Sequence, residues 1–147
     1  MIGADDDFVN QLTLGFAAHA AVPVAYTGMN QSKETTMEAI KDATHFYEVE
    51  RRARHAERPG FRISELQISP SQKVPWHYHS NVRDTFYVLE GKIRIFLRDP
   101  KEEVRLAPGE TYVVPPKRPH LVVNGGDASA TFLILQGIGE YDFIPLT

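Results

Sequence analysis

Beyond Gly60 the chain is a series of short runs rich in β-branched and aromatic residues, separated by turn-forming stretches. The runs are FRISELQIS, TFYVLEG, KIRIFLR, TYVVP, HLVVN and TFLILQG, and the stretches between them include SPSQK, DPKEE, APGE, PKRP and NGGDAS. Runs of this kind are typical of β-strands, and clusters of Gly, Pro, Asn and Asp are typical of turns. Because no run with helical spacing separates them, the pattern predicts an all-β antiparallel sandwich or a single antiparallel β-barrel.

The first 59 residues are patterned differently. Thr35 and Glu38 form a T-x-x-E capping box ahead of apolar residues at helical spacing, which predicts a short helix over residues 36–44. The pattern leaves open whether this helix continues to about Ala56 or gives way to a strand at HFYEV. We therefore expect residues 1–59 to form an N-terminal arm with a short helix.

Composition adds the domain count and excludes several kinds of site. The chain has 147 residues, of which 42% are apolar, and this fits one globular domain, which we expect over residues 60–147 with the arm packed outside it. There is no cysteine, so disulfides, thiolate nucleophiles and cysteine-bound metals are excluded, and a cytoplasmic location is favoured.

Charge bears on the partners. The formal net charge is −3, and neither the arm nor the β domain has the basic excess of a nucleic-acid surface, so no nucleic-acid partner is expected. No apolar run approaches the length that spans a bilayer, so no membrane partner is expected either. Small barrels have edge strands that need covering, which favours a homodimer.

Candidate chemistry begins in the stretch PWHYHSNVRDTFYVLEG, residues 75–91. Alternate side chains of a strand share a face, so His77 and His79 point the same way and form a ready pair of metal ligands. Asp84 follows where the next strand begins. The alternative is that these three residues are polar positions on a wet strand and at a strand start.

These positions resemble the first motif of the cupin family, G-x5-H-x-H-x(3–4)-E-x6-G. His77 and His79 fall on the two histidines, Asp84 falls on the glutamate, and Gly91 follows after six intervening residues. The leading glycine of the motif would fall at Ser71.

The stretch PGETYVVPPKRPHLVVN resembles the second cupin motif, G-x5-P-x-G-x2-H-x3-N. Gly109, Pro115, His120 and Asn124 keep its spacing, whereas the glycine before the histidine is replaced by Lys117. The resemblance covers about residues 60–137. It implies a cupin double-stranded jelly roll in which His77, His79, Asp84 and His120 bind one divalent transition metal ion, with iron, manganese, nickel, cobalt, copper and zinc all compatible.

Asp84 is the departure with the largest consequence, because it is one methylene shorter than the usual glutamate. Three outcomes are compatible with the sequence: the barrel contracts locally, Asp84 reaches the metal through a water, or the three histidines hold the metal alone. A fourth reading is that Asp84 only caps the start of its strand.

The rest of the pocket follows from alternation. If Asp84 faces inward then Phe86 and Val88 do too, and Gln136 is an inward polar candidate. For Asn124 we expect a structural role. Histidines outside the two motifs, His19, His45 and His55, are expected at the surface or as capping residues.

Two functions fit this site. The first is a metal-dependent enzyme, an oxygenase, isomerase or lyase acting on a small oxygenated molecule in the barrel, because an open metal position can polarise a bound oxygen. The alternative is a non-catalytic binding or sensor protein that takes a small-molecule ligand. Fold resemblance alone does not choose between them.

Overall fold

A computed structural model describes residues 43–147, and this part of the chain contains ten β-strands and no helix. The strands are β1 (Arg51–Arg58), β2 (Phe61–Ile68), β3 (Lys73–Tyr78), β4 (Arg83–Glu90), β5 (Ile93–Leu97), β6 (Glu102–Leu106), β7 (Thr111–Val114), β8 (His120–Asn124), β9 (Ala130–Gly137) and β10 (Ile144–Pro145). Every strand pair is antiparallel, as the sequence predicted. In this part of the chain no helix is long and apolar enough to cross a membrane.

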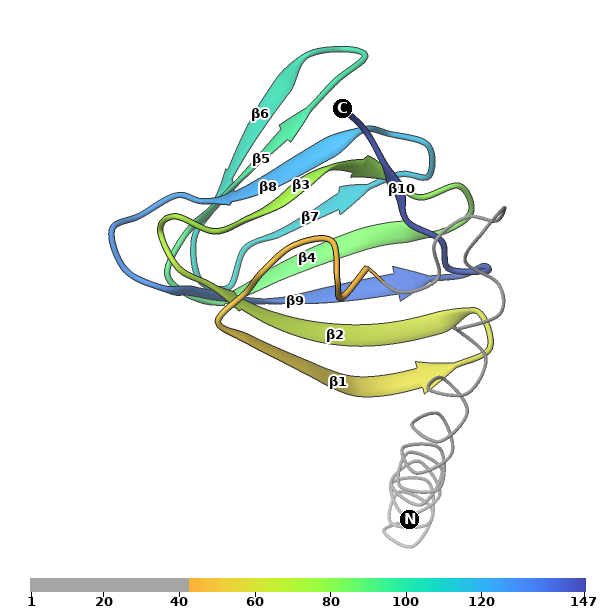
Figure 1. Cartoon of the computed structure of the whole chain (residues 1–147), viewed down its shortest axis with the longest axis horizontal. Coiled ribbons are helices and arrows are strands. Elements are labelled where there is room, and N and C mark those ends of the chain that lie inside the picture. Colours follow the sequence, from red (N-terminus) through yellow and green to blue (C-terminus); the bar gives the residue numbers. More distant parts are fainter. Residues whose placement is uncertain (1–42) are drawn as a thin grey trace, which may run out of the picture.

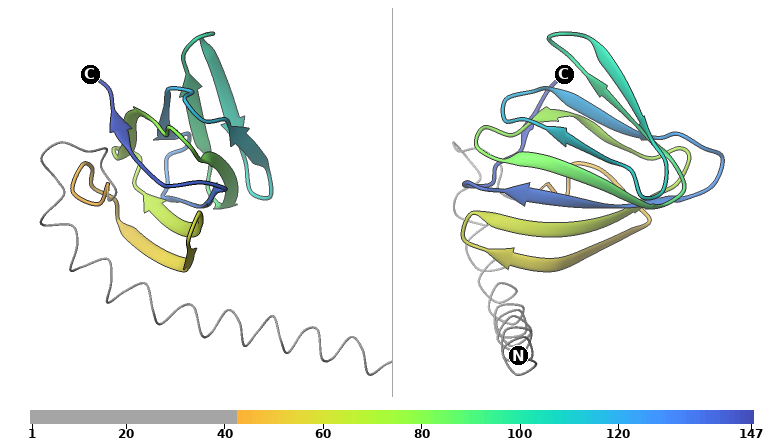
Figure 2. Two further views of the ribbon diagram at one scale, coloured as in Figure 1. Left: turned by 90° about the vertical axis from the view of Figure 1, so that its right-hand side faces the viewer. Right: turned by 180° about the vertical axis from the view of Figure 1, so that it is seen from behind.

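The strands form two five-stranded sheets that face each other (Figure 1). One has the order β1-β2-β9-β4-β7 and the other the order β10-β3-β8-β5-β6. The non-consecutive neighbours show a jelly-roll topology, and the turned views show the two layers from the side and from behind (Figure 2).

Of the sandwich and the single barrel that the sequence pattern left open, the structure has the two-sheet jelly roll, and the sheets do not close into one barrel. Hydrogen bonding stops at β1 and β7 in one sheet and at β10 and β6 in the other. Two of these edges are highly charged, with the sequences RRARHAER in β1 and EEVRL in β6. Charged side chains on an edge strand oppose further strand pairing, which explains why the sheets end there.

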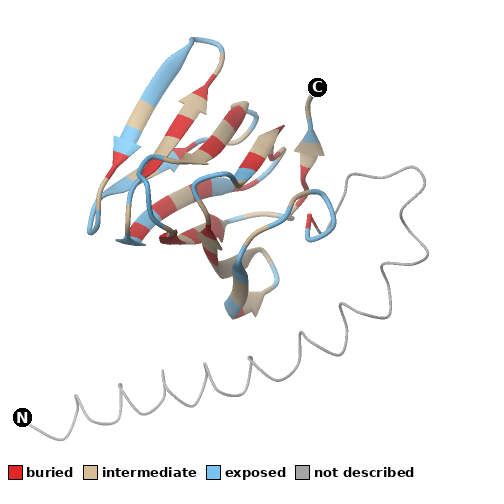
Figure 3. Ribbon diagram, turned by 60° about the vertical axis from the view of Figure 1, so that its left-hand side comes forward, coloured by how far each residue is buried: buried red, intermediate tan, exposed pale blue. Residues whose placement is uncertain are grey.

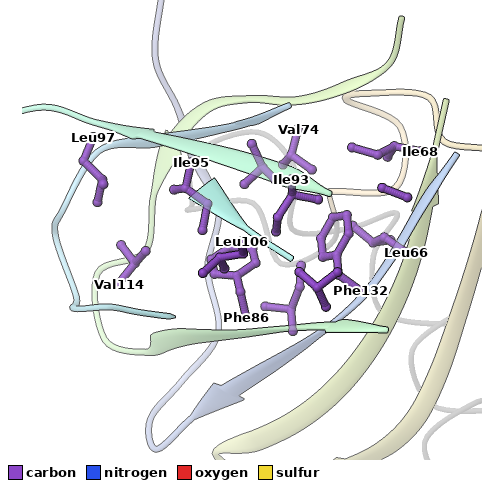
Figure 4. Packing of buried hydrophobic residues seen from close by; sticks show 14 of the residues in the cluster. Leu66, Ile68, Val74, Phe86, Ile93, Ile95, Leu97, Leu106, Val114 and Phe132 are labelled. Atoms are coloured by element: carbon purple, nitrogen blue, oxygen red, sulfur yellow. The ribbon is translucent and has the colours of Figure 1, made fainter. Parts of the chain in front are cut away.

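The apolar core fills the space between the sheets. Ile93, Ile95 and Leu97 of β5 are buried, and Arg94 between them faces outward onto Glu103. Buried residues alternate with exposed ones along the strands (Figure 3), and the buried side chains meet between the layers (Figure 4). The two rigid layers therefore hold side chains from opposite sheets at fixed separations.

The N-terminal boundary differs from the prediction. Residues 51–58, which were assigned to the arm, form β1 and pair with β2, so neither a helix continuing to Ala56 nor a strand at HFYEV is present. The strand is hard to find in sequence because charged residues occupy most of it, as its edge position permits. The predicted helix over residues 36–44 lies almost wholly outside the described residues, and residues 44–46 form a turn.

Candidate metal centre

The three motif histidines come from neighbouring strands of the same sheet. His77 is near the end of β3, His79 follows that strand, and His120 begins β8. The register places His77 directly opposite His120. All three side chains are buried, with 1–3% exposed. The fold therefore brings together the three histidines that the sequence singled out.

Asp84 reaches the same point from the opposite sheet, at the start of β4. Its Oδ2 atom lies 2.9 Å from Nε2 of His79 and 3.0 Å from Nε2 of His120. One candidate ligand atom from each of the four residues lies within 4.8 Å of the others. The shorter side chain of Asp84 thus reaches the histidine nitrogens directly, and the reading of Asp84 as a mere strand cap is wrong.

Backbone carbonyls fix the proton positions of the histidines. A carbonyl oxygen can only accept, so each Nδ1 carries a hydrogen. Nε2 of His79 and His120 also carries one where it donates to the Asp84 carboxylate, and without that proton the neutral ring offers its Nε2 lone pair. This is the form in which histidine binds a metal. The three Nδ1-to-carbonyl distances are 2.7 Å for His77 to Pro75, 2.5 Å for His79 to Asp142 and 2.9 Å for His120 to Arg118.

The electrostatics of the cluster favour a bound positive charge. Burial opposes ionisation of Asp84, but the charge of His79 and the hydrogen bonds of both neighbouring histidines outweigh it and hold the pKa of Asp84 well below its usual value. Burial also lowers the pKa of His77, which stays neutral. For His79 burial acts in the same direction, but Asp84 outweighs it and raises the pKa. The negative charge of Asp84 stabilises a proton on the neighbouring His79 ring, and the same charge would stabilise a divalent cation bound there.

The segment after β9 supports the histidines, a role that the two sequence motifs did not predict. Phe143 stacks on His77 with ring centroids 4.3 Å apart, and the backbone carbonyl of Asp142 holds His79. The Asp142 side chain in turn accepts a hydrogen bond from the Ser80 amide at 2.7 Å. The aromatic residues that flank Asp142 in YDF were the available signal, but they lie beyond the two motifs.

Two motif residues have structural roles. Lys117, which replaces the family glycine, has φ of 66°, a left-handed conformation that favours glycine, and its amide donates to the His79 carbonyl at 2.6 Å. Asn124 donates to the carbonyls of Ile68 and Ala128 and accepts from the Gly126 amide, which confirms the structural role expected for it.

A small cavity of about 20 Å³ adjoins the cluster and has room for about one water molecule. A second cavity of about 170 Å³ lies beside it, and both are lined by Gln136 and Tyr141. Phe86 lines the first cavity and Val88 is buried in the core, so the inward orientation predicted for both is confirmed. Gln136 is also inward, with 5% of its surface exposed.

Comparison with known proteins agrees with the fold. The cupin domain model matches residues 64–136. An uncharacterized protein of Methanocaldococcus jannaschii is 31% identical over 71 residues, which are 48% of this chain and only 55% of that relative.

Solved structures give the same result at lower identity. A Klebsiella pneumoniae protein with a double-stranded β-helix domain is 19% identical, with a TM-score of 0.58 over 66% of this chain and 84% of its own. The oxalate decarboxylase of Lactobacillus farciminis, solved as a formate complex, is 20% identical, with a TM-score of 0.54 over 59% of this chain and 27% of its own. From its motifs, its two-sheet jelly roll and the match over residues 64–136, the chain belongs to the cupin superfamily.

Proposed function

We propose that this protein is a metal-dependent enzyme that acts on a small molecule with oxygen donor atoms. The observation that carries the proposal is the buried cluster of His77, His79, Asp84 and His120, in which one candidate ligand atom of each residue lies within 4.8 Å of the others. His77, His79, His120 and Asp84 would hold one divalent transition metal ion. Such an ion, when bound, supplies a Lewis-acidic position for an oxygen ligand. Three nitrogens and one carboxylate oxygen are a donor set that iron, manganese, nickel, cobalt, copper and zinc all accept.

The residues around the cluster define what kind of molecule could react there. Phe86, Ile134 and Phe143 give the small cavity an apolar lining on part of its wall. Tyr141 lines both cavities, and burial raises the pKa of its phenol, so its hydroxyl stays protonated and can donate a hydrogen bond to an oxygen of the substrate. The larger cavity supports a substrate bigger than one water but still small, which would reach the cluster past Gln136 and Tyr141.

The test is elemental analysis of purified protein, followed by assays with the metal so identified. We expect about one transition metal ion per chain, in line with a single His/carboxylate site. Turnover of small hydroxy acids, keto acids and dicarboxylates should be assayed in air and without oxygen, which separates oxygenase from isomerase or lyase chemistry. Protein without stoichiometric metal would contradict the proposal. Metal with ligand binding but no turnover would favour the non-catalytic sensor instead.

We further propose that the protein is a homodimer that pairs through the outer face of the β1-β2-β9-β4-β7 sheet. Tyr87, Leu89 and Val113 on that face are 37%, 42% and 46% exposed. Tyr87 lies opposite Leu133 of β9, which extends the apolar surface across three strands. Isologous pairing would place this surface against its own copy.

Light scattering would test the dimer. The unsubstituted chain should have twice the monomer mass, and Val113→Glu should be monomeric at the same concentration because it puts a charge into the interface. Arg105→Ala, on the edge strand of the other sheet, is the control and should leave the dimer intact. A monomeric unsubstituted chain would remove the proposal.

Location and the remaining partners stay predictions from the sequence. The cytoplasmic assignment depends on the absence of cysteine, and the absence of a nucleic-acid partner depends on the net charge of −3.

A further inference from the structure

The two carboxylate oxygens of Asp84 have different neighbours. Oδ2 faces the Nε2 atoms of His79 and His120, whereas Oδ1 accepts a hydrogen bond from the side-chain amide of Gln136 at 2.8 Å. Gln136 is directly opposite Asp84 in the β4–β9 register and is buried. The two oxygens therefore differ: Oδ2 faces the histidines of the cluster, whereas Oδ1 already accepts a hydrogen bond from Gln136.

Arg62 fixes the orientation of that amide. It is directly opposite Gln136 in the β2–β9 register, and its Nε donates to the Gln136 carbonyl oxygen at 2.9 Å. A guanidinium has only donors, so the Gln136 oxygen must face Arg62 and the NH2 group must face Asp84. Arg62 is held in turn by Tyr141, whose ring centroid lies 3.3 Å from the guanidinium carbon. Arg62, Gln136 and Asp84 thus form one row across three adjacent strands.

We propose that Gln136 and Arg62 are positioning residues that present Asp84 to the metal through Oδ2 alone. This inference depends on the metal centre of the proposed function. With Oδ1 held by an N–H donor, the carboxylate cannot turn about its Cβ–Cγ bond to offer both oxygens. The row keeps Asp84 a one-oxygen ligand, so one more metal position is left for substrate than a two-oxygen carboxylate would leave. The row also holds the short Asp84 side chain in the position from which Oδ2 reaches the histidine nitrogens.

Co²⁺ is a suitable probe because its visible spectrum reports coordination number. Affinity and spectrum would be measured for the unsubstituted chain, Gln136→Met, Arg62→Met and the double variant. We expect Gln136→Met to lower Co²⁺ affinity by about 10–100-fold, the range for partners that orient a metal ligand. Its spectrum should lose intensity as the released carboxylate adds its second oxygen to the metal.

The decisive comparison is the double variant, because the row connects Arg62 to Asp84 through Gln136. Arg62→Met should weaken Co²⁺ binding in the unsubstituted background and should add nothing in the Gln136→Met background. Additive losses would overturn the proposal and point to general loosening of the sheet. Arg94→Met, on the outward face of β5, is the matched control and should change neither affinity nor spectrum.

Gln136→Leu covers the case in which Gln136→Met does not fold. Like methionine, leucine has no N–H donor for Oδ1 of Asp84, so it should weaken Co²⁺ binding as well. Unchanged affinity and spectrum in the Gln136 variants, with Co²⁺ bound by the unsubstituted chain, would overturn this inference and leave the metal centre standing. If the unsubstituted chain binds no Co²⁺, the metal centre and the inference fail together.

Discussion

Alanine at both His77 and His120 should abolish stoichiometric metal binding while the jelly roll stays folded. The double variant keeps only His79 and Asp84 of the four candidate ligands, and two ligands do not make a closed site for a divalent ion. Metal affinity should fall by more than the roughly 10–100-fold that is typical when a residue that only orients a ligand is replaced. Elemental analysis after exhaustive dialysis measures the occupancy.

The fold of this variant should survive because most of the apolar core packs away from the histidines, and of the described core residues only Phe143 and Phe86 lose ring contacts with them. Val74, Phe86 and Ile95 are buried in the apolar cluster between the sheets. Circular dichroism should therefore show unchanged strand content. His55→Ala is the control, since His55 is exposed on β1 and pairs with Glu65. Full metal retention in the double variant would show that the ligand set is wrong.

Replacement of Asp84 by asparagine should weaken the metal sharply, whereas Asp84→Glu should retain it. Asparagine keeps the shape but removes the buried negative charge that attracts the cation. Glutamate keeps the charge and restores the residue of the family motif. Its cost is one extra methylene in a site where Asp84 already reaches the histidine nitrogens at 2.9–3.0 Å.

Metal content and turnover measured together assign the role of Asp84. If it is a ligand, Asp84→Asn loses metal and activity in parallel. If the three histidines hold the metal and Asp84 moves a proton on the substrate, Asp84→Asn keeps the metal and loses turnover. Unchanged metal and unchanged turnover in both variants would mean that Asp84 has neither role.

Sequence patterns predicted the parts of the fold that depend on local alternation. The core face of β5 and the inward orientation of Phe86 follow from period-two burial, and the strands that carry them are rich in apolar residues. The edge strands β1 and β6 were missed because their side chains are mostly charged and lack that alternation. A strand with one buried face has alternating apolar and polar residues. An edge strand buries less of its surface, so its sequence can lack that alternation.

The candidate site also has a part that local sequence patterns predicted and a part that they did not. His77, His79 and His120 were found because their spacing is local and matches a known motif. Gln136 was recognised only as an inward polar residue, and its partner Arg62 could not be found, because the two are 74 residues apart and meet through the β2–β9 register. Register between distant strands is a property of the assembled sheets, so no local pattern contains it.

The positions of the four candidate ligands have a mechanical consequence. His77, His79 and His120 belong to one layer of the jelly roll, whereas Asp84 belongs to the other. An ion held by all four would cross-link the layers at a single point inside the core. Its binding energy would then oppose separation of the layers, and would add to stability in proportion to the logarithm of free metal. Loss of the metal should therefore raise amide exchange first along β4 and β8, the strands that contain Asp84 and His120.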